Sequence, residues 1–301
     1  MSTDETTKSG FSLSKFLIGR PLETTALPHQ RVSKRVGLAV FASDALSSTA
    51  YATEEILIIL ALAGTSASTL GMSIPIAIAI AILLTIVTIS YRQTIYAYPN
   101  GGGAYIVARD NLGELPAQIA GAALLTDYIL TVAVSISAGV AQITSGFPAL
   151  LPYRVDIAIG VILVMTIVNL RGVRESGQIF AIPTYFFIVT MFTTLIVGII
   201  RAATGNLGTV TGVEVVHSTS QSLTLFLILR AFSSGCTALT GIEAISNGIM
   251  AFKEPRSHNA AVTLIWMSTI LIALFLGITF MAHQIGALPS ETETIISQIG
   301  R

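Results

Sequence analysis

The sequence predicts an all-α membrane protein with about seven transmembrane helices, of which the first and the sixth are interrupted. Three observations predict this fold class. The 301 residues are 52% hydrophobic and only 11% charged, with a mean hydropathy of +0.78, which is typical of membrane proteins. Seven apolar runs are long enough to cross a bilayer. Two of these runs carry clusters of polar residues at their centres.

Residues 1–35 are polar and basic and lack the apolar core of a cleavable signal, so we expect a cytoplasmic tail. A formal net charge of zero gives no basic surface for nucleic acid. The single cysteine, Cys236, and four scattered histidines indicate no disulfide, no metal centre and no cofactor. Because no nucleophile–histidine or metal-ligand spacing occurs, we do not expect an enzyme.

The first predicted span, residues 36–62, contains the polar stretch Phe41–Tyr51. An aspartate such as Asp44 at this depth costs about 2.5–3.5 kcal/mol, and hydroxyl side chains compete with the helical hydrogen bonds. Membrane helices tolerate freed backbone groups only in protein or beside a wet cavity. We therefore interpret the stretch as an unwound, ion-facing break. The alternative is a helix that starts at Asp44 after a separate short segment.

The second span is predicted at 73–98 and the third at 115–145. The Gly101–Gly103 run between them lacks a following Gly-Lys-Ser/Thr, so a nucleotide loop is disfavoured. We expect a tight turn and a short intracellular helix at 104–111. Within the third span, Asp127, Thr131 and Ser135 lie on one helical face and suggest a ladder of cation ligands. Alternatively, the two hydroxyls bond only their own helix.

The remaining spans are predicted at 155–171, 177–203, 221–251 and 258–284. The sixth run contains three glycines, several hydroxyl residues and Glu243 at its centre, which indicates a second broken helix. Transporters built from inverted repeats place such helices at matching positions, with the site between them. We predict a transporter core at 36–284 and an extracytoplasmic tail or loop at 285–301. With a five-helix repeat, the chain ends two helices into the second copy.

Lysine and arginine positions predict the orientation. With the N-terminus inside, twelve of the sixteen basic residues lie in the tail and the other cytoplasmic loops, whereas three lie outside and Arg230 lies within a span. This bias predicts a cytoplasmic N-terminus.

Three stretches together resemble the KimA-type potassium importers, which belong to the KUP potassium-uptake group of the amino acid–polyamine–organocation superfamily. These stretches are Ser43–Tyr51, Tyr98–Tyr105 and Gly235–Asn247. The resemblance implies a LeuT-like fold and proton-coupled potassium uptake by a homodimer in the cell membrane. Full-length members often carry a C-terminal domain that binds a cyclic dinucleotide; any such regulation would need that domain, which is absent from this chain.

Matched by motif, the ion-binding set has members in the first, third and sixth helices. They are Asp44, Tyr51, Asp127, Thr131, Ser135, Thr240 and Glu243. Tyr51 rests on the resemblance alone, whereas depth and spacing also indicate the others.

Potassium is a hard cation that suits the oxygen ligands of this set. Three carboxylates are more than one monovalent cation needs, so we expect Glu243 to carry the coupled proton and Asp44 and Asp127 to lie closer to potassium. The alternative is an amino-acid or polyamine permease of the same superfamily. Asp44 would repel a substrate carboxylate, an objection that does not apply to a polyamine. A non-transporting membrane protein is disfavoured because buried acids are costly in a scaffold.

Overall fold

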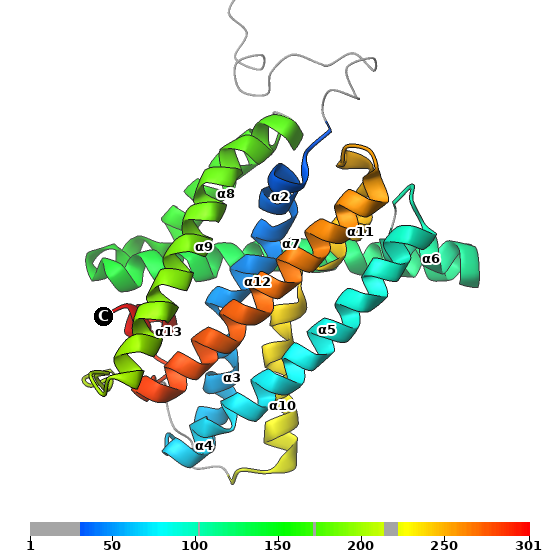
Figure 1. The fold of residues 1–301 in the computed structure, drawn as a ribbon. Coiled ribbons are helices and arrows are strands. Elements are labelled where there is room, and N and C mark those ends of the chain that lie inside the picture. The colour runs from blue at the N-terminus through cyan, green and yellow to red at the C-terminus, as the bar shows by residue number, and fades with distance from the viewer. Residues whose placement is uncertain (1–30, 102, 171–172, 214–221) are drawn as a thin grey trace, which may run out of the picture.

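The structure is a computed structural model that describes residues 31–101, 103–170, 173–213 and 222–301, and its regular elements in these ranges are helices (Figure 1). Within these ranges, six helical stretches, some made of more than one element, are long and apolar enough to cross a membrane. They match the second to seventh predicted spans. The first predicted span is divided into two helices, so the predicted all-α membrane fold with an interrupted first helix is confirmed.

The elements follow the predicted order closely. The predicted intracellular helix at 104–111 is present as α6, and the fourth predicted span is preceded by a 3-10 segment. The elements are α2 (Lys34–Ser47), η2 (Ser48–Ala50), α3 (Ala52–Ala61), α4 (Ala67–Gly71), α5 (Ser73–Ala97), α6 (Gly103–Leu112), α7 (Glu114–Gly146), η3 (Pro148–Tyr153), α8 (Arg154–Leu170), α9 (Val173–Ala203), α10 (Leu225–Gly235), η4 (Cys236–Leu239), α11 (Glu243–Asn247), η5 (Ile249–Ala251), α12 (Arg256–Ile285) and α13 (Ile295–Gly300).

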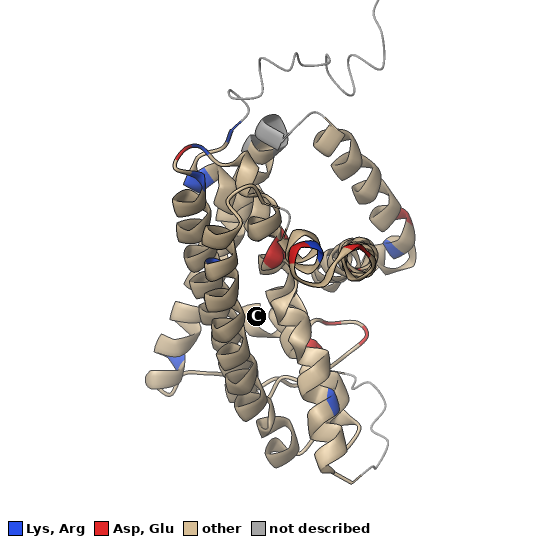
Figure 2. Cartoon of the chain, turned by 90° about the vertical axis from the view of Figure 1, so that its right-hand side faces the viewer, with Lys and Arg blue, Asp and Glu red and all other residues tan. Residues whose placement is uncertain are grey.

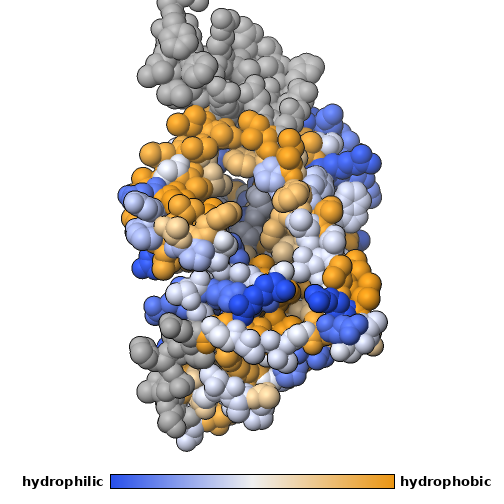
Figure 3. Space-filling view, turned by 90° about the vertical axis from the view of Figure 1, so that its left-hand side faces the viewer, coloured by the Kyte–Doolittle hydropathy of each residue, from blue (hydrophilic) through white to orange (hydrophobic). Residues whose placement is uncertain are grey.

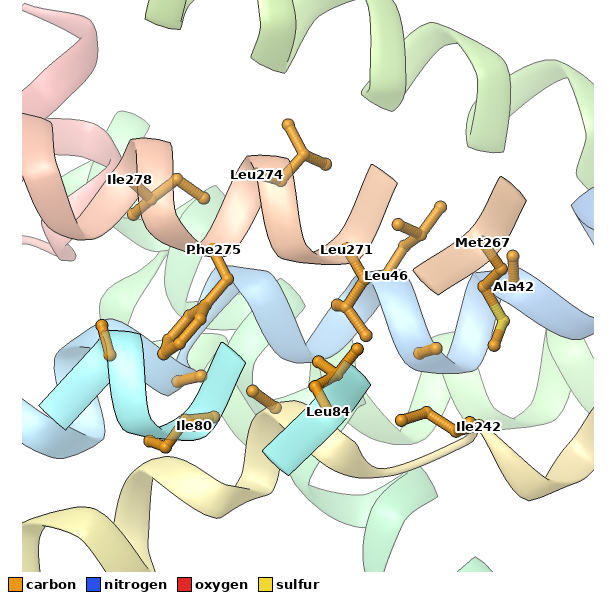
Figure 4. Close-up of a cluster of buried hydrophobic side chains, with 14 of the residues drawn as sticks. Ala42, Leu46, Ile80, Leu84, Ile242, Met267, Leu271, Leu274, Phe275 and Ile278 are labelled. Carbon is orange, nitrogen blue, oxygen red and sulfur yellow. The ribbon is translucent and has the colours of Figure 1, made fainter. Parts of the chain in front are cut away.

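The core is built around α12, which packs most extensively against α5 and also against α2 and α9. Its buried side chains Leu271 and Phe275 lie close to Leu84 and Ile80 of α5 (Figure 4). Lipid tails are as apolar as leucine, so close packing and interhelical hydrogen bonds hold such helices together. Two buried hydroxyl pairs provide these bonds. Thr88 donates to Ser268 over 2.8 Å, and the hydroxyls of Thr53 and Thr279 are 2.9 Å apart.

The outer helices present apolar side chains to their surroundings. In the most hydrophobic stretch of η3–α8, none of the residues is buried in the structure. In the corresponding stretch of α7, only 11% of the residues are buried. Figure 3 shows broad apolar areas on the side of the molecule where α8 and α9 lie, and Figure 2 shows how sparse charged residues are along the helices. These surfaces suit lipid or further helices, as expected for a multi-pass membrane protein.

A short contact, here called the clasp, joins the residues before α2 to the residues after α11. Val32 donates to the Ala251 carbonyl over 2.8 Å, and Lys253 donates to the Val32 carbonyl over 3.0 Å. The rings of Phe41 and Phe252 stack with their centroids 5.4 Å apart. The clasp therefore links α2 to the end of the α10–α11 region, and Figure 1 shows the start of α2 and the α11–α12 connection at the same end of the bundle.

Candidate functional site

The first break follows directly from its hydroxyl residues. Ser47, Ser48 and Thr49 each donate to the backbone carbonyl three residues earlier, over 2.6, 2.6 and 2.7 Å. Side chains that bond nearby carbonyls favour departure from α-helical geometry, and the chain tightens into η2 and bends at Tyr51 (φ −128°, ψ −19°). The break begins later than we expected, because Asp44 still lies within the last turn of α2. It is also not a helix start, so neither sequence interpretation is right in detail.

The second break lies directly against the first. After η4, Thr240 is extended and Gly241 adopts a left-handed conformation with φ +81° before α11 begins. A Cβ atom on Gly241 would lie 2.7 Å from the backbone nitrogen of Ala45 and 2.8 Å from Oδ2 of Asp44. Glycine is therefore required here both by its backbone angle and by the close approach of the Asp44 carboxyl group.

The three predicted acids come from three different elements and converge. Asp44 on α2 lies close enough to Asp127 on α7 for electrostatic interaction, and Glu243 on α11 interacts with both. The Glu243 carboxyl group also lies beside the backbone amides of Gly241 and of its own residue. Like charges at short range repel, so this arrangement favours the entry of cations or protons.

Hydroxyl groups lie beside these acids. The Tyr51 side chain is buried and lies next to those of Ser135 and Thr240, which brings the first, third and sixth predicted helices together. The Oγ atoms of Ser135 and Ser47 are 2.9 Å apart. Ser135 thus reaches across to α2 and does not merely bond its own helix. Thr131 is buried one turn from Ser135 and shares its face by helical register.

The structure adds residues that the sequence analysis did not select. Asn247 at the end of α11 donates through Nδ2 to the hydroxyl of Tyr128 over 2.7 Å. Tyr128 and Tyr91 also lie within electrostatic range of Glu243. A tyrosine in an apolar run resembles an ordinary membrane-interface residue. Asn247, an amide side chain within a predicted span, is the residue of these three that the sequence could have indicated as part of a site.

The glycine loop before α6 lies against the same part of α11. Gly103 has φ +43°, and a Cβ atom there would collide with the side-chain oxygen of Asn247. A Cβ atom on Gly101 would lie 3.1 Å from the backbone carbonyl oxygen of Asn247. The loop therefore does more than turn the chain: the backbone of Gly101 and Gly103 packs against α11.

An acidic cleft opens on the other side of the first break. It has a volume of about 400 Å³ and lies between α3, α7 and the segment before α13. Its lining includes Tyr51 of the predicted site and four carboxyl residues, which are Glu54, Glu55, Glu291 and Glu293. Glu55 also accepts a 2.9 Å hydrogen bond from Ser234 of α10, so it both lines the cleft and ties α3 to α10.

The donor set suits a monovalent cation better than a tightly chelated metal. Within the described ranges, no group of three or more His, Cys, Asp and Glu side chains is close enough to hold a metal ion. Asp127 is exposed although Thr131, one turn away on the same face of α7, is buried, so the site is open at Asp127. The chemistry available is loose coordination by carboxylate and hydroxyl oxygens, together with a carboxyl group that can accept a proton.

Comparisons with known proteins agree with this architecture. The profile of a family described as amino acid permease matches residues 38–300. The potassium transporter KimA of Bacillus subtilis is 53% identical over 293 residues, which cover 96% of this chain and 47% of that protein. The chloroplastic cationic amino acid transporters 6 and 7 of Arabidopsis thaliana are 28% and 26% identical, each over 57% of this chain and 29% of their own length. The chain thus spans less than half the length of these relatives.

Proposed function

The chain belongs to the amino acid permease family, and on that premise we propose that it provides the ion-binding part of a potassium importer driven by a proton gradient. The observation that carries the proposal is the meeting of three carboxyl groups with the hydroxyls of Tyr51, Ser135 and Thr240 at two adjacent helix breaks. The similarity to the potassium transporter KimA supports potassium as the cation.

In this proposal some of the acids bind potassium and one carries the proton. Asp44 and Asp127, with Thr131 and the three hydroxyls, bind potassium. Glu243 carries the proton, because it interacts with both other carboxyl groups and one of its own oxygens is buried with no hydrogen-bond partner, which disfavours its charged form. A proton on Glu243 reduces the repulsion between the acids. The two ions are coupled in this proposal because potassium and this proton are released to the same side in one transport cycle.

We further propose that residues 1–35 form a cytoplasmic tail, residues 36–284 the transporter core and residues 285–301 part of an extracytoplasmic segment, in the lipid bilayer of the cell membrane. Most of the tail lies outside the described residues. The exposed side of α7 requires a further wall, since an open acid within a membrane is costly. We propose that additional helices of the second repeat provide that wall, and that the complete protein acts as a homodimer.

The second candidate is a permease for cationic amino acids or polyamines, favoured by the similarity to the two plant transporters. Gly241 is the single glycine of the second break, and the first break has none, so few bare amides are free to bind a substrate carboxylate. Asp44 at that place would repel such a group. A polyamine avoids this objection, because it has no carboxylate.

Rubidium-86 uptake into vesicles containing the full-length protein tests the proposal. We expect an inward proton gradient to drive uptake, and potassium but not spermidine or lysine to block it. Replacing Glu243 with Gln should leave rubidium binding in place and remove the dependence on the gradient. If spermidine or lysine accumulates and rubidium does not, the permease candidate is correct and the potassium proposal is wrong.

A further inference from the structure

Three buried oxygen atoms on the short helix α11 have no hydrogen-bond partner. They are Oε1 of Glu243, Oγ of Ser246 and Oδ1 of Asn247. Ser246 is only 1% exposed. A buried polar atom without a partner costs about 1–3 kcal/mol, so three on one helix require an explanation.

The positions of these residues place their side chains together. Spacings of three and four residues put Glu243, Ser246 and Asn247 on one helical face. Side chains on a helix lean toward its N-terminus, so Ser246 and Asn247 lean toward Glu243. The Asn247 amide is oriented by its Nδ2 donation to Tyr128 over 2.7 Å, which leaves its oxygen beside the bare backbone of Gly103.

We propose that these three side chains hold one buried water molecule, which passes the proton of Glu243 to the cytoplasmic side. The inference rests on the proposed proton-carrying role of Glu243. The hydrogen-bond count fits water: two oxygens need a donor, the serine hydroxyl can donate, and a water molecule donates twice and accepts once. Three oxygens from a single helical turn would leave most of the coordination shell of a potassium ion empty.

The transfer is balanced at each atom. The O–H bond of the Glu243 carboxyl group breaks and a new O–H bond to the water forms. The water gives another of its protons to a second water molecule on the cytoplasmic side, which becomes hydronium, so a carboxylate and an intact first water molecule remain. The ionisable groups that face Glu243 are Asp44 on α2, Asp127 and Tyr128 on α7, and Tyr91 on α5. When Glu243 is ionised, the two neighbouring carboxylates, Asp44 and Asp127, favour its reprotonation.

The test is proton entry and rubidium uptake measured together in vesicles containing the full-length protein. In Ser246→Ala, we expect both rates to fall about tenfold, the factor for one hydrogen bond lost in the transition state, with rubidium affinity unchanged. Ser246→Thr restores the hydroxyl and should restore the rate. Ser268→Ala is the matched control, because Ser268 is also buried but accepts a hydrogen bond from Thr88.

The possible failures can be told apart. If Glu243→Gln retains proton coupling, the proposed role of Glu243 is wrong and the water relay falls with it. If Glu243→Gln loses coupling but Ser246→Ala transports at the wild-type rate, the relay alone is wrong. A map of the full-length protein that resolves ordered water provides a check independent of any variant: density between the three side chains supports the inference, and continuous apolar packing there overturns it.

Discussion

The contact between the two helix breaks can be tested at Gly241. With alanine at a φ of +81°, the left-handed backbone alone costs about 1–2 kcal/mol. The added Cβ atom would also lie 2.7 Å from the Ala45 nitrogen and 2.8 Å from Asp44 Oδ2. Both are closer than carbon normally approaches, so Asp44 must shift. A displacement near 1 Å in a preorganised site can cost about a hundredfold, so we expect rubidium affinity to fall at least tenfold.

Gly286 offers a matched control. It ends α12 with φ +66°, and a Cβ atom there would meet nothing within 4 Å. Gly286→Ala should therefore share the backbone cost, lowering the melting temperature by several degrees, without affecting the ion. Rubidium-86 binding and thermal unfolding of the purified full-length protein measure both quantities. If Gly241→Ala binds rubidium as tightly as Gly286→Ala, contact with Gly241 does not fix the position of Asp44 and the reasoning is refuted.

Two further predictions concern the clasp and the hydrogen bond between Asn247 and Tyr128. Phe252→Ala removes a fully buried ring that stacks on Phe41 and should cost about 3–5 kcal/mol, seen as loss of folded protein on size-exclusion chromatography. Phe226→Ala, at a ring that is 75% exposed, should change stability by less than about 0.5 kcal/mol, and an equal loss in both would contradict the assigned burial. Tyr128→Phe deprives the Asn247 amide of its acceptor, which should cost about 1–3 kcal/mol by thermal unfolding; an unchanged melting temperature would show that the bond contributes nothing.

The sequence predicted the parts of the site that depend on local chemistry. Polar residues inside an apolar run are conspicuous, so both breaks and the acids Asp44, Asp127 and Glu243 were predicted before the structure. The exact start of the first break was not predicted, because it depends on which carbonyl each hydroxyl group donates to. Ser47, Ser48 and Thr49 donate to carbonyls three residues earlier, and Asp44 stays helical.

Contacts between distant segments could not be predicted in this way. The Ser47–Ser135 pair joins residues 88 positions apart, and nothing local distinguishes that partner from the helix backbone. The Tyr128–Asn247 pair was missed for the same reason: nothing local indicates that the fold brings Tyr128 of α7 beside Asn247 of α11. The acidic cleft likewise combines Glu54 and Glu55 with glutamates more than 230 positions later.

The clasp has a mechanical consequence. The backbone N–H and carbonyl of Val32 are both hydrogen-bonded to the residues that follow α11, so the start of α2 and the end of the second broken helix are tied together at this residue. A force transmitted along the chain from before Val32 would therefore reach α2 and the segment that follows α11 at the same time.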